Sequence, residues 1–304
     1  MAEPWEADVR IDVALASRAI ARQFPTLAAN AVVPFGEGWD NAAFLVGGRY
    51  VFRFPRREVA VALIETERRV LASIAAHGPL PIPIPLFAGM PDGEYPWPFA
   101  GYAVLRGRPL SSVRLDDDAY ESLAVSCGRF LRALHAIDAL PLRASGLDTD
   151  RIGRLDHARC MPKVLRRLGE LSASGLLDEV APFERLLDEV APAGPRGDRL
   201  AIVHGDLYAR HLLIGDDRRA AGIIDWGDVH LGDPAVDLAI VFEAFPPRTR
   251  DAFADAYGKI DDQTWKLARY HAVYHTAMVA HYGYRIGDAD LVRAGLAGLL
   301  SCGV

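Results

Sequence analysis

The separation of strand-type from helix-type sequence constrains the fold of this chain more than any other feature. Around residues 31–56, the segment AVVPFGEGWDNAAFLVGGRYVFRFPR alternates short apolar runs with Gly and Asn, which is typical of antiparallel hairpins. From Asp116 onward, apolar residues recur mainly at helical spacings. The sequence therefore predicts an α+β protein, and its 304 residues favour two domains.

The expected elements follow this division. A helix at 8–24 precedes three strands, which lead into Gly36 and span 43–46 and 50–54, and a helix at 59–76 and a strand from Gly101 complete the sheet region. The remaining expected helices are 119–137, 162–172, 182–190, 246–257, 264–284 and one from Ala289.

Composition narrows the class of protein. A net charge of -6 argues against a nucleic-acid-binding surface, which needs an excess of Lys and Arg. The cysteines Cys127, Cys160 and Cys302 lack metal-ligand spacing and are predicted to be reduced thiols. The N-terminus has acids where a signal peptide has a basic region, and no apolar run approaches the roughly twenty residues of a spanning helix. We expect a cytoplasmic monomer with neither nucleic-acid nor membrane partners.

Two polar sequence segments, called phrases below, interrupt the predicted helical region that begins at Asp116. VHGDLYARHLLIGDD begins at Val203 and GIIDWGDVHLGDPAVDLA begins at Gly222, each following a short predicted strand. Asp206 and Asp225, at the ends of these strands, could form one site in which one carboxylate orients a hydroxyl and the other holds a divalent cation. Such a site suits phosphoryl transfer, which depends on positioning and charge neutralisation.

The residues HGDLYARHLL, IDWGD and DPAVDLA together resemble the catalytic and metal-binding segments of the aminoglycoside and macrolide antibiotic phosphotransferases. The resemblance implies a two-lobed protein-kinase-like fold, with a small antiparallel-sheet N-lobe and a larger, mainly helical C-lobe. The N-terminal nucleotide-binding lobe would span residues 1–105, with a hinge near 102–107. The C-terminal catalytic and substrate-binding lobe would span residues 106–304.

The resemblance also implies roles for residues of the two phrases. Asp206 would be the catalytic base, His204 its structural neighbour, and Asp225 a Mg²⁺ ligand. His211 stands where protein kinases carry an Asn of the second metal site. Because Mg²⁺ prefers oxygen ligands, this imidazole could touch the metal weakly, act through water, or hydrogen-bond a phosphate. Asp237 would brace the catalytic loop.

Further positions are implied in the N-terminal region. Arg53 occupies the strand position of the phosphate-binding Lys, and it keeps the positive charge. Glu67 would pair with Arg53, although Glu65 is only two residues away. The remaining nucleotide-binding positions are Gly36, Gly38 and Asn41 of a loop that lacks the third glycine of the kinase pattern, and Val104 and Leu105 of the hinge.

Substrate recognition is expected in the helices that follow the metal motif. An aminoglycoside would need several converging carboxylates, whereas a macrolide would need a large apolar wall. Aromatic residues at helical spacing are also explained by a core stripe, and His135 is expected to be a core histidine. The candidate substrate residues are Asp228, His230, Glu243, Tyr270 and Tyr274.

Three functional hypotheses follow. The preferred one is transfer of the γ-phosphate of ATP or GTP, with Mg²⁺, to a hydroxyl of an aminoglycoside or macrolide antibiotic. The second is the same chemistry on a metabolite such as choline, homoserine or a sugar, because the shared motifs do not identify the acceptor. The third is a catalytically silent nucleotide-binding protein, suggested by Arg53, His211 and the sparse glycines. The presence of both Asp206 and Asp225 weighs against it.

Overall fold

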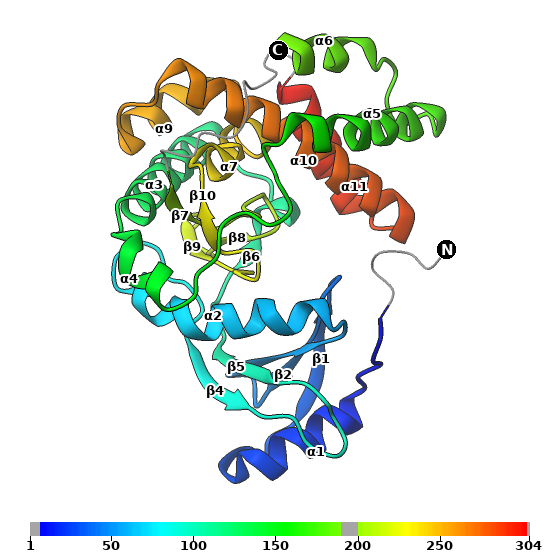
Figure 1. Ribbon diagram of the computed structural model, residues 1–304, viewed down its shortest axis with the longest axis vertical. Coiled ribbons are helices and arrows are strands. Elements are labelled where there is room, and N and C mark those ends of the chain that lie inside the picture. Colours follow the sequence, from blue (N-terminus) through cyan, green and yellow to red (C-terminus); the bar gives the residue numbers. More distant parts are fainter. Residues whose placement is uncertain (1–6, 190–199, 303–304) are drawn as a thin grey trace. The chain divides into compact units, whose positions relative to one another are not determined.

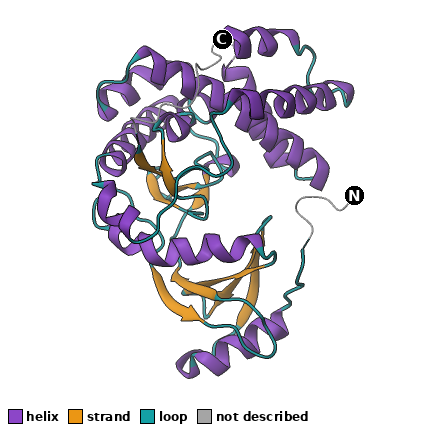
Figure 2. Cartoon of the chain, in the orientation of Figure 1, coloured by secondary structure: helices purple, strands orange, loops and turns teal. Residues whose placement is uncertain are grey.

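The computed structural model describes residues 7–189 and 200–302, and the chain packs into two compact units. One unit comprises residues 1–76 and 81–105, and the other comprises residues 77–80 and 106–304. The elements of each are labelled in Figure 1, and Figure 2 distinguishes helices from strands.

The first unit is built on a five-stranded antiparallel sheet in the order β1-β2-β3-β5-β4. Between β2 and β3, Gly47 and Gly48 both have positive φ angles, which glycine adopts without steric cost, and this permits the tight turn. The strands are β1 (Val32–Glu37), β2 (Asn41–Val46), β3 (Tyr50–Pro55), β4 (Pro85–Gly89) and β5 (Phe99–Ala103).

The two faces of this sheet differ in chemistry. Because side chains alternate along a strand, Phe52 and Phe54 of β3 enter an aromatic core with Ile20 of α1 (Val13–Gln23). Arg53 lies between them and points to the opposite face, where it contacts Glu67 of α2 (Val59–Ala75). The sheet thus separates an apolar, aromatic core from the face that carries the Arg53–Glu67 ion pair.

The second unit is mainly helical. Its longest helix, α10, contacts α5, α7, α8 and α11 (Figure 1). The helices are α3 (Asp117–His135), α4 (Ala139–Ala144), α5 (His157–Ala173), α6 (Ala181–Glu189), α7 (Ala235–Leu238), α8 (Ile240–Glu243), α9 (Arg250–Tyr257), α10 (Asp262–Ile286) and α11 (Ala289–Cys302). Short 3₁₀ turns occur at Pro25–Leu27 in the first unit and at Leu110–Ser112 and Pro247–Thr249 in the second.

Five short strands of the second unit hold two loops side by side. β7 (Ala201–Val203) pairs with β10 (His230–Gly232), and β8 (Leu212–Ile214) lies between β6 (Arg108–Pro109) and β9 (Ala220–Ile223). Val203 faces His230 across one pair, and Leu212 faces Ile223 across the other. The loop 204–211 therefore starts and ends beside the ends of the loop 224–229.

The predicted α+β class, with an antiparallel sheet and a mainly helical remainder, is confirmed, but three helix starts were wrong. Helix α9 begins at Arg250, not at 246, because a 3₁₀ turn occupies Pro247–Thr249. Helix α5 begins at His157, not at 162, because Asp156 caps it by accepting a hydrogen bond from the Arg159 amide. Helix α1 begins at Val13, not at residue 8, for the same reason at Asp12. The last residue of the helix expected at 182–190 lies outside the described residues.

Two expectations from composition can be compared with the structure. None of the helices within residues 7–189 and 200–302 is long and apolar enough to cross a membrane. Cys127, Cys160 and Cys302 are buried free thiols.

Candidate active site

The backbone around His204 and Gly205 is held from inside the second unit by Asp237. This fully buried carboxylate accepts hydrogen bonds from the His204 amide at 2.7 Å and the Gly205 amide at 2.9 Å. His135 donates from Nε2 to the same carboxylate at 3.1 Å, and these hydrogen bonds lower the pKa of Asp237 although burial raises it. The bracing contacts expected of Asp237 are present, and His135 is a satisfied core histidine.

His204 itself is a buried structural residue. Its Nε2 donates to the Ile224 carbonyl at 3.0 Å, and its Nδ1 accepts from the Asp206 amide at 3.2 Å. Burial lowers the pKa of His204, which agrees with a neutral ring that has one donor and one acceptor. His204 therefore links the loop 204–211 to the loop 224–229 without carrying charge.

Gly205 shows why this loop has its sequence. Its φ is 85°, and an added Cβ would lie 2.3 Å from the Asp228 carbonyl oxygen. Any larger residue would be strained by its backbone angle and would displace the second loop. The tight turn at Gly205 places Asp206 directly after the backbone that Asp237 holds.

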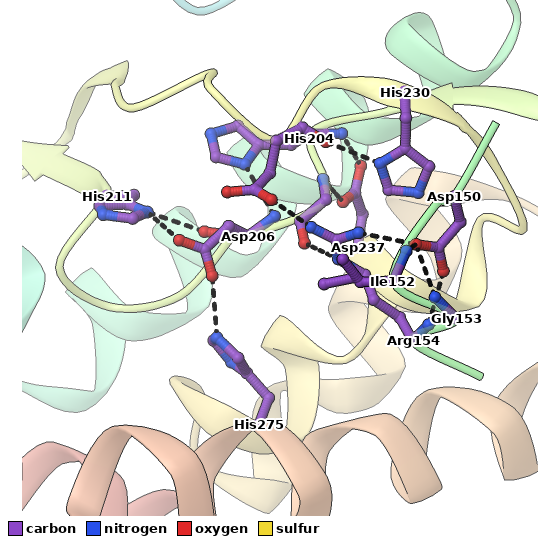
Figure 3. Close-up of polar contacts among 12 residues, drawn as sticks. Asp150, Ile152, Gly153, Arg154, His204, Asp206, His211, His230, Asp237 and His275 are labelled. Carbon is purple, nitrogen blue, oxygen red and sulfur yellow. Dashed lines mark hydrogen bonds and ion pairs between the residues drawn. The ribbon is translucent and has the colours of Figure 1, made fainter. Parts of the chain in front are cut away.

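Asp206 is bound by two imidazoles (Figure 3). Its Oδ1 accepts from His275 Nε2 at 3.0 Å, and its backbone carbonyl accepts from His211 Nδ1 at 2.7 Å. Burial raises the pKa of Asp206, but the hydrogen bond from His275 and the charges of both imidazoles lower it overall. The carboxylate is thereby kept ionised and oriented.

His211 also reaches the second loop. Its Nε2 lies 3.3 Å from Oδ2 of Asp225. Burial lowers the pKa of His211, whereas the hydrogen bond and charge of Asp225 raise it, and the net direction is upward. His211 thus connects the main chain of Asp206 to the side chain of Asp225, so these three of the expected site residues lie together.

The Asp225 carboxylate is suited to a hard cation. Its side chain is 44% exposed, and the backbone φ of 65° is unusual for a residue other than glycine. Carboxylate oxygen is the donor that Mg²⁺ prefers, and Mg²⁺ commonly takes one or two carboxylates plus phosphate oxygens and water. Within residues 7–189 and 200–302, no group of three or more His, Cys, Asp and Glu side chains could hold a metal by itself. Asp225 could therefore hold Mg²⁺ if phosphate and water supplied the remaining oxygen ligands.

A buried arginine that the sequence did not reveal connects both loops to a third segment. Arg154 pairs with Asp150 at 2.8 Å (Figure 3). It also donates from Nε to the Gly205 carbonyl at 2.8 Å and pairs with Asp228. Burial lowers the pKa of Arg154, but the neighbouring carboxylates raise it overall. Arg154 stays charged and stabilises the loop 204–211 through the Gly205 carbonyl.

A second missed feature lies behind Asp206. His275 of α10 donates from Nδ1 to Glu243 of α8 at 2.8 Å while its Nε2 bonds Asp206. Glu243 and His275 are both buried. A signal for this contact was present, since His271, His275 and His281 recur along one predicted helix, but a core stripe explained the spacing equally well.

The five candidate substrate residues differ in the contacts that their side chains make. Asp228 pairs with Arg154, and His230 is buried and donates from Nδ1 to the Asp228 carbonyl at 2.6 Å. Glu243 pairs with His275, as described above. Tyr270 is fully buried, and its hydroxyl has no hydrogen-bond partner in the described part of the chain, while the ring of Tyr274 lies beneath the Arg167 guanidinium. A substrate role for any of the five stays a prediction.

In the first unit, Arg53 and Glu67 form the expected pair. Arg53 Nη1 lies 2.7 Å from Glu67 Oε1, and the carboxylate is almost completely buried. Tyr102, a residue without an assigned role in the pair, donates its hydroxyl to Glu67 Oε2 at 2.8 Å. Two donors on one buried carboxylate fix its orientation, and Glu67, rather than Glu65, is thus identified as the partner.

The other candidate nucleotide-binding residues lie at the ends of strands. Gly36 and Gly38 have open space around an added Cβ, so neither glycine is required by close packing in this conformation. The side-chain oxygen of Asn41 is buried without a partner among the described residues. Just after β5, the Val104 amide donates to the Arg49 carbonyl at 2.9 Å, and Leu105 follows it as the last residue of the unit.

Comparison with known sequences gives consistent matches. A model described as the phosphotransferase enzyme family matches residues 31–272. Among curated proteins, the uncharacterized protein YcbJ of Bacillus subtilis is 25% identical over 240 residues, covering 74% of this chain and 72% of that protein. An aminoglycoside 3'-phosphotransferase of Escherichia coli is 29% identical over 159 residues, which is 51% of this chain and 55% of that enzyme.

Solved structures share the fold over nearly the whole chain. The GDP complex of aminoglycoside 2'-phosphotransferase-IIIa superposes with a TM-score of 0.69 at 23% identity, covering 96% of this chain and 99% of that one. Macrolide 2'-phosphotransferase MphH from Brachybacterium faecium gives a TM-score of 0.59 at 23% identity, covering 95% and 97%. The predicted two-lobed, protein-kinase-like fold is confirmed.

Proposed function

The chain belongs to the phosphotransferase enzyme family, and on that premise we propose that it transfers the γ-phosphoryl group of ATP or GTP to a hydroxyl group of a small molecule. One observation carries the proposal. His211 hydrogen-bonds the Asp206 carbonyl and lies 3.3 Å from the Asp225 carboxylate, so the proposed base and the proposed metal ligand lie side by side. This supports a functioning transferase over a silent nucleotide-binding protein.

We assign Asp206 the role of base. The acceptor oxygen attacks the γ-phosphorus while the bond to the β-phosphate oxygen breaks, and the nucleoside diphosphate leaves with that electron pair. The hydroxyl proton passes to the Asp206 carboxylate, which is ionised because its pKa is lowered. Such transfers depend mainly on orientation and charge stabilisation, and a base of low pKa is sufficient for them.

Two cations, a Mg²⁺ ion and Arg53, are proposed to neutralise the charge of the nucleotide phosphates. Asp225 is the proposed ligand of Mg²⁺, which when bound neutralises phosphate charge. His211, hydrogen-bonded to the Asp206 carbonyl, orients the Asp225 carboxylate from the side. Arg53 is the proposed phosphate contact of the first unit, and it is paired with Glu67, which Tyr102 orients through a hydrogen bond.

For the acceptor we propose an aminoglycoside or macrolide antibiotic. Related solved enzymes are named as aminoglycoside and macrolide phosphotransferases, and one is a complex with kanamycin. Within this class, charge pairing supports a weakly cationic acceptor of the macrolide type. Asp228 and Glu243 are already paired with Arg154 and His275, and a polycationic aminoglycoside would have to displace those partners.

The proposal is tested by incubating the purified protein with Mg²⁺, ATP or GTP and single acceptors. The panel contains macrolides, aminoglycosides and, for the metabolite alternative, choline, homoserine and sugars. We expect nucleoside diphosphate release and a phosphoryl mass gain on a macrolide or an aminoglycoside. Mass gain on a metabolite alone would contradict the antibiotic assignment, and no mass gain on any acceptor would contradict transferase activity on these classes.

A further inference from the structure

We infer that His275, held from behind by Glu243, is a positioning residue that fixes the Asp206 carboxylate for the reaction. The inference rests on the proposed role of Asp206 as the base. It concerns a contact between residues far apart in the sequence, with the catalytic loop on one side and helices α8 and α10 on the other.

Both ring nitrogens of His275 lie within hydrogen-bond distance of a carboxylate oxygen. His275 Nε2 lies 3.0 Å from Asp206 Oδ1, and His275 Nδ1 lies 2.8 Å from Glu243 Oε2. An ionised carboxylate only accepts hydrogen bonds, so we assign a proton to each ring nitrogen, with both carboxylates ionised. A doubly protonated ring between two acceptors cannot rotate without losing both charge-assisted bonds.

Packing restricts the ring further. The ring of His271, one turn earlier on α10, is stacked at 5.8 Å and 15°, and the ring of Tyr208 meets His275 edge-on at 5.1 Å. Both His275 and Glu243 are buried, and Gly298 of α11 packs closely against the backbone of Glu243. The imidazole therefore sits in a rigid setting, which a positioning residue needs.

The electrostatics agree with this geometry. Burial lowers the pKa of His275, but Glu243 and Asp206 raise it to about 10. Burial lowers the pKa of the neighbouring His271 to about 3, so that ring is neutral. Burial also raises the pKa of Glu243, against the effect of the imidazolium. The charged groups that face His275 are thus Asp206 of the catalytic loop and Glu243 of α8.

This arrangement divides the work of the Asp206 carboxylate between its two oxygens. Oδ1 is anchored by His275, while Oδ2 lies 3.6 Å from His211 Nδ1, beyond hydrogen-bond distance. We assign Oδ2 to the acceptor hydroxyl. The imidazolium makes Asp206 a weaker base but fixes where its second oxygen points, and phosphoryl transfer needs the orientation more.

The first test compares substitutions at His275. In His275→Ala the anchor is lost, and we expect kcat to fall about a hundredfold, the size of loss that a misplacement of about 1 Å causes. The affinity for ATP or GTP should be unchanged. In His275→Gln the side-chain amide can still donate to Asp206, so most of kcat should return, to within about tenfold of the unsubstituted enzyme.

His281→Gln is the matched control. His281 is buried on the same helix and also bonds a carboxylate, that of Glu170 on α5, away from Asp206. This variant should keep the kcat of the unsubstituted enzyme. Equal losses in His281→Gln and His275→Ala, or loss of nucleotide binding together with kcat, would overturn the inference in favour of a purely structural role. A kcat within twofold of normal in His275→Ala would overturn it as well.

A second measurement does not depend on activity. Nuclear magnetic resonance of ring ¹⁵N-labelled protein at neutral pH should show two slowly exchanging ring N–H protons that disappear in His275→Gln. The Nε2 proton should shift in Asp206→Asn and the Nδ1 proton in Glu243→Gln. A singly protonated His275 ring would overturn the inference whatever the activity. Two ring protons in a protein that phosphorylates no acceptor would support the contact and count against the proposed function.

Discussion

Two buried histidines beside Asp206 take opposite protonation states. His204 donates one hydrogen bond and accepts another, and burial lowers its pKa. His275 donates to two carboxylates, and these raise its pKa to about 10 although it is buried. Burial favours the neutral form of both rings, and only at His275 do the two carboxylate partners outweigh it. His204 is therefore a neutral structural imidazole beside Asp206, and His275 a cationic one.

This difference predicts a pH dependence of stability. The pKa of His275 is raised from 6.5 to about 10, so its stabilisation is fully present below pH 6.5 and is lost as pH rises through about 10. The Tm difference between the unsubstituted protein and His275→Gln should therefore be larger near pH 6.5 than near pH 10. Thermal unfolding of both proteins at the two pH values measures it. A Tm difference that grows with pH would contradict a cationic His275.

Residue-level prediction from the sequence succeeded where the partners are local. Asp206, His211 and Asp225 could be grouped because their motifs lie in two neighbouring phrases. His275 is 69 residues from Asp206, and Tyr102 is 35 residues from Glu67. Neither long-range contact leaves a local pattern, and helical spacing explained the aromatic and imidazole residues as core. Only the folded structure shows which residues distant in the sequence lie in contact.

At the level of elements, close packing of α11 on α10 supports the helix that carries His275. Gly295 of α11 lies so near α10 that an added Cβ would be 2.5 Å from the Ala280 amide nitrogen. Gly283 of α10 has a similar constraint, with Leu291 of α11 2.7 Å from an added Cβ. Small residues therefore set the distance between these two helices.

Gly295→Ala should lower the free energy of unfolding by about 1–3 kcal/mol, because the added methyl forces the helices apart. Gly169→Ala is the control, since Gly169 lies inside α5 with no atom within 4 Å of an added Cβ. Better helix propensity should make that variant more stable by about 0.5–1 kcal/mol. Urea unfolding of both variants decides the matter, and a stabilised Gly295→Ala would disprove the close contact.

Helices were easier to predict than short strands. The periodicity of α2, α3 and α10 located these helices, but α1 and α5 begin where Asp12 and Asp156 cap them, a signal that was not used. The apolar runs before the two polar phrases predicted β7 and β9, whereas the three-residue strands β8 and β10 are too short to show a period. They exist because they pair, β7 with β10 and β8 with β9, and pairing is a tertiary property.

For the whole molecule, the fold identifies the chemistry but not the acceptor. The motifs and the matching structures agree on a phosphotransferase, and the same fold serves enzymes named for aminoglycosides and for macrolides. The choice of acceptor depends on which carboxylates are available. Sequence could not show that Asp228 is held by Arg154, because 74 residues separate them.

Asp206 is proposed to act in the chemical step and not in nucleotide binding. Turnover of the acceptor found by the panel and affinity for ATP or GTP should be measured together in Asp206→Ala. We predict a loss of kcat by about 10²–10⁴-fold, the usual contribution of a general base, with nucleotide affinity within about twofold of normal. Full turnover in Asp206→Ala, or a parallel loss of nucleotide affinity, would contradict the account.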